Sequence, residues 1–230
     1  MTETEWLECV DPCPMLEYLN AHDLLSNRKQ RLFDCACVRR IWHLLHDPRG
    51  RRAVEAAERY ADGDASLDEL RETQAIALAA ADAQTTLYPP GTPDSFTVLA
   101  AAAETTWEFR SGADPIRHAA EALAWEGLNY NVRSERLLAR NKLAEEKKTQ
   151  ASLLREIVGN PYLKHSISPS FVAEELARGI YMKGEFGILP TLGEALQKDG
   201  CDSPKILAHC WLPGPHVKGC WVVDFVLGNH

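Results

Sequence analysis

The sequence lacks the short motifs on which the common nucleotide-dependent and hydrolytic enzymes depend. The patterns Gly-x-Gly-x-x-Gly, the Walker phosphate-binding loop, Gly-x-Ser-x-Gly and His-Glu-x-x-His do not occur in its 230 residues. These enzyme classes therefore lose support, and a non-enzymatic protein becomes the simpler interpretation.

Long apolar segments and an export signal are missing as well. No window approaches 18 apolar residues without a charge, so we expect no membrane span and no membrane partner. Residues 1–6 are acidic where a signal peptide needs a basic region, and no apolar region follows them. We therefore expect a cytoplasmic protein.

The cysteines lack the regularity of a disulfide framework or a zinc knuckle. There are seven, an odd number at irregular spacings, and none form a Cys-x2-Cys pair. In a chain without an export signal we expect these thiols to be reduced.

What the sequence does contain is typical of an ordinary globular protein. It has 45% hydrophobic and 25% charged residues, a formal net charge of -8 and a pI of about 5.5. This acidity argues against a protein whose whole surface binds nucleic acid. Residues 133–148 are basic on balance, but no aromatic side chains interleave with them; a solvated helix face is favoured, and a nucleic-acid patch is the alternative.

The periodicity of the apolar residues predicts an all-α fold. We expect a multi-helix bundle with long alanine-rich middle helices, from Ser66 to about Leu87 and over residues 94–109, and a C-terminal bundle of short helices. A further helix should occupy residues 29–46, and a long one should start at Asp114 and run through Leu138 to the basic stretch.

The proline-rich loop from Tyr88 to Pro93 is the strongest break in the chain. It suggests three parts: an N-terminal helical part (1–88), a long-helix middle part (94–150) and a C-terminal helical bundle (151–230). The three parts could also form one continuous domain.

The last apolar run, residues 219–228, is ambiguous because its Trp, Val and Phe residues favour a strand. No partner strand is evident elsewhere, and an isolated strand cannot satisfy its backbone. We therefore expect a buried helix over residues 215–227. In such a helix His216, Cys220 and Asp224 would share one face.

The C-terminal segment also holds residues that could bind a metal ion. Imidazoles and thiolates are the ligands that tetrahedral zinc prefers. The candidate zinc ligands are Cys201, His209, Cys210, His216 and Cys220. The alternative is that the cysteines fill the core and the histidines face solvent.

A cysteine-dependent enzyme is another interpretation of the same residues. Cys220 would attack, His216 would take its proton, and Asp224 would orient the imidazole. The apolar neighbours of Cys220 oppose this, because burial raises the pKa of a thiol. Asp224 itself requires a cationic partner on another helix, for which Arg39 and Arg40 are candidates.

Five blocks of the sequence are distinctive: residues 5–7 (EWL), 35–42 (CACVRRIW), 153–161 (LLREIVGNP), 207–210 (LAHC) and 213–224 (PGPHVKGCWVVD). In these blocks the chain resembles a large paralogous family of uncharacterised bacterial proteins that is abundant in planctomycetes. The family has no established activity, cofactor or catalytic residue. The resemblance implies a cytoplasmic protein whose two ends pack around a common core while the middle helices vary.

Together these observations predict a non-enzymatic protein-interaction or scaffold module with a protein partner. A structural zinc site or a cysteine-dependent site in the C-terminal bundle is the alternative.

Overall fold

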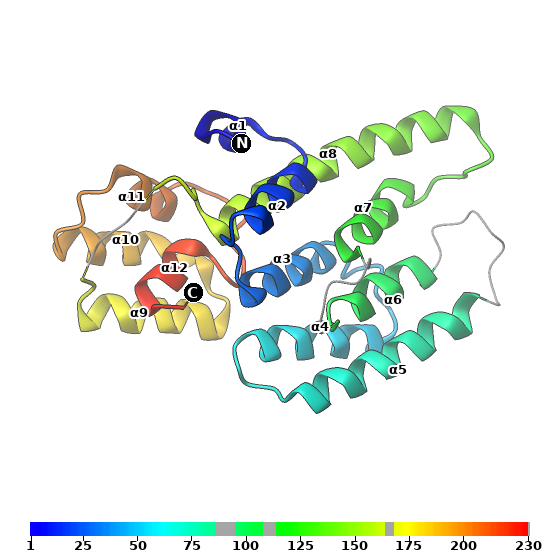
Figure 1. The fold of residues 1–230 in the computed structure, drawn as a ribbon, viewed down its shortest axis with the longest axis horizontal. Helices are drawn as coiled ribbons and strands as arrows, with labels where there is room; N and C mark the ends of the chain where they lie inside the picture. The colour runs from blue at the N-terminus through cyan, green and yellow to red at the C-terminus, as the bar shows by residue number, and fades with distance from the viewer. Residues whose placement is uncertain (86–94, 108–113, 164–167, 230) are drawn as a thin grey trace.

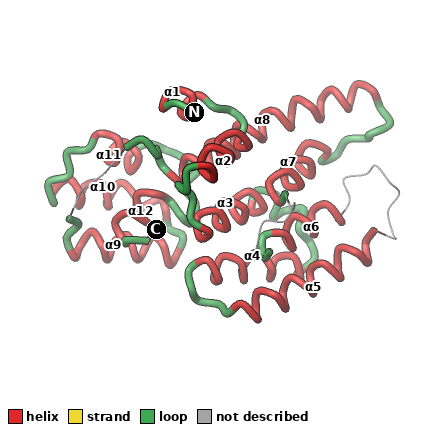
Figure 2. The backbone as a smooth tube through the Cα atoms, in the orientation of Figure 1, coloured by secondary structure: helices red, strands yellow, loops and turns green. Residues whose placement is uncertain are grey.

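The computed structural model of the chain describes residues 1–85, 95–107, 114–163 and 168–229. In these ranges there are twelve α-helices, one short 3-10 helix and no β-strand (Figure 1 and Figure 2). The predicted all-α fold is therefore confirmed. Within the same ranges, no helix combines the length and the apolar character that crossing a bilayer requires.

The first eight helices form one unit, called here the N-terminal unit (residues 1–163). All eight contribute side chains to a single buried hydrophobic cluster. They are α1 (Glu3–Glu8), α2 (Pro12–Ala21), α3 (Asn27–Arg39), α4 (Pro48–Ala61), α5 (Leu67–Thr85), α6 (Ser95–Glu104), α7 (Pro115–Trp125) and α8 (Arg133–Val158).

Helix α3 lies in the middle of this unit. It packs against α4, α6, α7 and α8. Seven consecutive residues, from Leu32 to Val38, are buried, so this end of the helix is covered on all sides.

The alanine-rich helices pack closely, as their small side chains allow. Helix α5 packs along α6 and α4, and Ala77, Ala80, Ala101 and Ala103 are fully buried. Ser66 accepts a hydrogen bond from the backbone N–H of Glu69 at the start of α5, as its sequence position predicts. The loop from Tyr88 to Pro93 lies outside the described residues.

The remaining helices form the C-terminal unit (residues 168–229), which lies at one end of the molecule (Figure 1). It has a hydrophobic cluster of its own. Its elements are α9 (Phe171–Lys183), the 3-10 helix η1 (Phe186–Ile188), α10 (Leu189–Lys198), α11 (Pro204–Trp211) and α12 (Trp221–Leu227).

Three of the predicted helices differ from the structure by several residues at one end or are broken, and a fourth, expected over residues 94–109, already ends at Glu104 as α6. The helix expected over residues 29–46 already ends at Arg39, and Pro48 begins α4, for which Asp47 is the N-cap. The long helix expected from Asp114 is two helices: α7 ends at Trp125, Gly127 adopts a φ of 71°, and α8 begins at Arg133. Tertiary packing explains the break between these two helices, because α8 packs against α7.

The third wrong boundary is that of the last helix, expected from residue 215. It begins only at Trp221. Residues 213–220 are an irregular segment, since prolines at 213 and 215 disfavour helical backbone in the residues before them. His216, Cys220 and Asp224 therefore do not share a helix face.

The division into three parts at residues 88–94 and 150–151 stays a prediction. Helix α8 runs without a break across residues 150 and 151. The two ends of the chain meet near the end of this helix, where Glu3 accepts hydrogen bonds from Asn160 and Lys205.

A buried ion network joins the two units. Asp224 of α12 is 1% exposed and lies 2.8 Å from Nη1 of Arg28 and 2.5 Å from Nζ of Lys29, both on α3. Arg28 also pairs with Asp62, which in turn binds Lys218. The predicted cationic partner on another helix is thus confirmed.

The expected identity of that partner is wrong. Arg39 pairs with Glu58, and Arg40 pairs with Glu146. Lys29 instead turns into the interface, where its Nζ donates hydrogen bonds to the carbonyls of Ile157 and Gly219 at 2.8 and 2.9 Å. Burial lowers the pKa of Lys29, and the nearby carboxylate of Asp224 opposes this shift.

Substituting Asp224→Asn should destabilise the protein by about 3–5 kcal/mol, because Lys29 then loses its buried counter-ion and Arg28 keeps only Asp62. Urea unfolding followed by circular dichroism measures the change. The control is Glu175→Gln, which breaks the exposed pair with Arg178 and should hardly alter the midpoint. Equal midpoints for both variants would contradict the structural role of Asp224.

Candidate metal site

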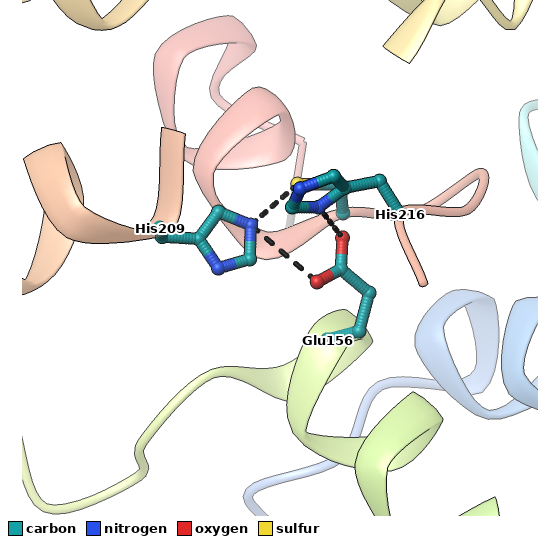
Figure 3. Close-up of side chains that lie close together, drawn as sticks. Glu156, His209 and His216 are labelled. Carbon is teal, nitrogen blue, oxygen red and sulfur yellow. Dashed lines mark hydrogen bonds and ion pairs between the residues drawn. The ribbon is translucent and has the colours of Figure 1, made fainter. Parts of the chain in front are cut away.

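Four side chains that could bind a metal ion converge where the two units meet. Glu156 comes from the last turn of α8, His209 from α11, and His216 and Cys220 from the irregular segment before α12. Figure 3 shows the two imidazole rings directed at the carboxylate of Glu156, with the sulfur atom beside them. The donor atoms all lie within 4.8 Å of one another.

Local sequence explains how these segments reach one another. Helix α8 ends at Gly159, which adopts a φ of 76° and ψ of -151° that other residues rarely adopt. The irregular segment turns at Gly219, with a φ of 88°, so that Cys220 becomes the N-cap of α12. The chain thus turns at Gly159, just after Glu156, and at Gly219, just before Cys220. These turns allow the carboxylate of Glu156 and the thiol of Cys220 to lie in one cluster.

Three of the separations between donor atoms are near those of a tetrahedral zinc site. Nε2 of His209 lies 3.2 Å from Sγ of Cys220 and 3.4 Å from Oε2 of Glu156. Nδ1 of His216 lies 3.0 Å from Oε1, the other oxygen of Glu156. Zinc bonds of about 2.0–2.3 Å in a tetrahedron imply ligand separations of about 3.3–3.7 Å. The four donor atoms lie within 4.8 Å of one another, so they would draw together around an ion.

The site is buried and polar. Glu156 is 6% exposed and Cys220 is fully buried. Burial by itself would raise the pKa of Glu156, but hydrogen bonds from His209 and His216 outweigh it and lower that pKa. The hydrogen bond to Glu156 raises the pKa of His216, against the effect of burial. Without a metal, Glu156 is therefore a carboxylate held by two imidazoles.

The second nitrogen of His216 suits a metal ligand. Its Nε2 lies 3.3 Å from the carbonyl oxygen of Leu212, to which it can donate a hydrogen bond. Metal-bound histidines usually donate their other ring N–H to such an acceptor, which fixes the tautomer. Without a metal Nδ1 of His216 donates to Glu156, and it would give up this proton to bind a cation while Nε2 keeps its own.

The second nitrogen of His209 has a different partner. Nε1 of Trp221 donates a hydrogen bond to Nδ1 of His209 at 3.0 Å. An indole N–H is only a donor, so Nδ1 carries the lone pair and the neutral ring has its proton on Nε2. In this arrangement Nε2 of His209 donates to Glu156 or Cys220.

This arrangement does not form a cysteine-dependent catalytic triad. His216, the expected base, is hydrogen-bonded to Glu156 and to the carbonyl of Leu212. His209 reaches Cys220 instead, but its other ring nitrogen faces the indole of Trp221 rather than an orienting carboxylate. Asp224, the expected orienting carboxylate, lies instead in the ion network with Arg28 and Lys29. Burial, followed by the charge of Glu156, raises the pKa of Cys220 well above its usual value.

The cluster brings together three of the five predicted zinc ligands: His209, His216 and Cys220. The other two, Cys201 and Cys210, are buried in the hydrophobic cluster of the C-terminal unit. Burial raises the pKa of Cys210 to about 12, which suits a core thiol. All seven cysteines lie in described residues, and each is a free thiol.

Sequence reasoning missed Glu156 and Trp221. Glu156 lies between Leu154, which is fully buried, and Ile157, also fully buried, in the last turn of α8. A carboxylate among core residues requires partners, and this signal could have marked it. No local pattern indicates that Trp221 would bind His209.

A cavity of about 240 Å³ borders the cluster. Its lining includes Glu156, His209, Trp221, Trp6 and Asn160. The site thus has a path to the outside on the side of Glu156 and His209.

Substituting Gly159→Ala should destabilise the protein by about 1–3 kcal/mol, because alanine rarely adopts this backbone conformation. The new Cβ would also lie 3.1 Å from Cγ and Cδ2 of Trp221. The control is Gly179→Ala in α9, where a Cβ meets nothing within 4 Å and helix propensity should improve. Urea unfolding compares them, and a Gly159→Ala variant as stable as the control would contradict the strain.

Comparison with family models, with curated proteins and with solved structures finds no match to this chain. The resemblance to the paralogous bacterial family therefore stays a prediction. The geometry of the cluster is what bears on function.

Proposed function

We propose that the chain is a zinc-binding protein in which the ion fastens the C-terminal unit to the end of α8. The observation that carries this proposal is the convergence of four donor atoms, from three separate segments, within 4.8 Å. Two of these donors are nitrogen, one is sulfur and one is oxygen.

The donor set favours zinc over the hard cations. Mg²⁺ and Ca²⁺ take oxygen ligands almost alone, whereas a thiolate with imidazoles suits zinc. The charges also balance, since a thiolate at Cys220 and the carboxylate of Glu156 together neutralise Zn²⁺. The same cation would offset the repulsion between Glu156 and a thiolate at Cys220.

A structural role is favoured because the protein can supply all four ligands. Structural zinc sites are closed in this way, whereas catalytic sites keep a position for water. Glu156 belongs to the N-terminal unit, and the other three ligands belong to the C-terminal unit. Bound zinc would cross-link the units at a point separate from the Asp224 ion network.

The wild-type protein, purified without a metal-binding tag, should contain about one zinc ion per chain by elemental mass spectrometry. His216→Ala and Cys220→Ala should weaken zinc binding by more than the roughly 10–100-fold that loss of an outer-shell partner costs. A chelator should lower the unfolding midpoint of the wild type, because zinc binds only the folded state tightly.

Cys210→Ala is the matched control, since it removes a buried thiol from α11 without touching the cluster. It should keep about one zinc per chain while losing some stability from the cavity. A wild-type chain that binds no added zinc, or zinc retention by Cys220→Ala equal to that of the control, would overturn the proposal.

A protein-interaction function is the second candidate, and the outer face of α9 favours it. Phe171 and Met182 are 76% and 75% exposed. They are eleven residues apart, which places them on the same helix face. A cytoplasmic protein partner could cover this face, and the interaction would not require the metal.

Chemical cross-linking in cell extract would test that candidate through the exposed Lys183 at the end of α9. The double variant Phe171→Ser and Met182→Ser should suppress intermolecular cross-links at Lys183. Unchanged cross-links in the double variant would remove the α9 face from consideration.

A further inference from the structure

We infer that Trp221 controls zinc binding, because its hydrogen bond to His209 and the binding of zinc to His209 exclude each other. This inference rests on the proposed zinc site. It assigns to Trp221 a positioning role: the indole sets which nitrogen of His209 carries the proton.

The two nitrogens of the His209 imidazole have different hydrogen-bond partners. Zinc binds neutral imidazole through a nitrogen that carries no proton, so a ligand Nε2 requires the proton on Nδ1. Nδ1 of His209 lies 3.0 Å from Nε1 of Trp221, whose N–H can only donate. Two N–H groups would then point at each other across this distance. Zinc at Nε2 therefore requires the indole to move.

Nε2 is the only nitrogen of His209 that can reach the ion. It lies 3.2 Å from Cys220 and 3.4 Å from Glu156, whereas Nδ1 faces Trp221. Figure 3 shows this nitrogen of His209 facing the carboxylate. The hydrogen bond from Trp221 therefore opposes zinc binding at Nε2 of His209, the nitrogen that would be the ligand.

The two histidines of the site differ in this respect. His216 has a carbonyl acceptor, that of Leu212, at its outer nitrogen. His209 has a donor there. His216 would only release its Nδ1 proton on binding zinc and keep the one on Nε2, whereas His209 would also have to place a proton on Nδ1, opposite the indole N–H.

The indole has space into which it can move. Trp221 lines the cavity of about 240 Å³ beside the cluster and also a second cavity of about 310 Å³. Its ring packs over Gly159, where the absence of a Cβ leaves room close to the backbone. A shift of this ring would let the proton of His209 pass from Nε2 to Nδ1, with no change in the number of protons on the ring.

The test compares zinc affinity in the wild type and in Trp221→Phe, by competition with a chromophoric chelator. Phenylalanine keeps an aromatic ring but lacks the N–H, so the variant should bind zinc about 3- to 10-fold more tightly. A residue that only supports the fold would instead weaken zinc binding when replaced. Trp211→Phe is the control, since Trp211 is 45% exposed on α11 and should leave the affinity unchanged.

Two further measurements do not depend on the affinity of the variant. Zinc should change the tryptophan emission of the wild type and of Trp211→Phe, but not that of Trp221→Phe. Nitrogen-15 NMR of the imidazoles should find the proton of His209 on Nε2 without zinc and on Nδ1 with zinc.

The outcomes separate this inference from the proposed function. Zinc binding by the wild type with equal or weaker binding by Trp221→Phe, or with no change of tautomer, would overturn the role of Trp221 alone. Zinc binding only by Trp221→Phe would overturn the proposed function of the wild type but support the role of Trp221, since the hydrogen bond would then keep the site empty. No binding by either protein would overturn the zinc site, and this inference with it.

Discussion

The burial of one carboxylate, that of Asp224, determines how the two halves of this molecule meet. A charge that is 1% exposed requires counter-ions, and α3 supplies two of them in Arg28 and Lys29. Because α12 carries the acid and α3 the bases, a shift of the C-terminal unit that separates them would leave buried charges without partners. Lys29 strengthens this constraint, since it also binds the carbonyl groups of Ile157 and Gly219.

The same constraint assembles the candidate metal site. Gly219 precedes Cys220, and Lys218 pairs with Asp62, so the irregular segment is held on the side of α3 and α4. In this position the side chains of His216 and Cys220 reach Glu156 in the last turn of α8. Hydrophobic packing alone would allow the two units to slide past each other. The hydrogen bond from Lys29 to Gly219 and the ion pair between Lys218 and Asp62 are directional, so they oppose such sliding.

The polar groups of the cluster formed by Glu156, His209, His216 and Cys220 are satisfied in the structure described. Glu156 accepts hydrogen bonds from both imidazoles, and Trp221 donates to His209. In the proposed zinc-bound state the same donor atoms would become ligands, and the partners at the outer ring nitrogens would decide how easily each histidine does so. The carbonyl of Leu212 suits that state, whereas the indole of Trp221 would have to move.

The sequence by itself determined the helical class, most of the helix starts and the need of Asp224 for a cation, because these follow from periodicity, from capping residues and from the cost of burying a charge. It also indicated His209, His216 and Cys220 as candidate ligands. Only the tertiary structure decided that α3 ends at Arg39, that α12 starts at Trp221, and that Arg28 and Lys29 rather than Arg39 and Arg40 meet Asp224. It alone joined Glu156 and Trp221 to the site, since Glu156 lies 60 positions from His216 and Trp221 lies 12 positions from His209 on another helix, and such contacts depend on how the helices pack and leave no local pattern.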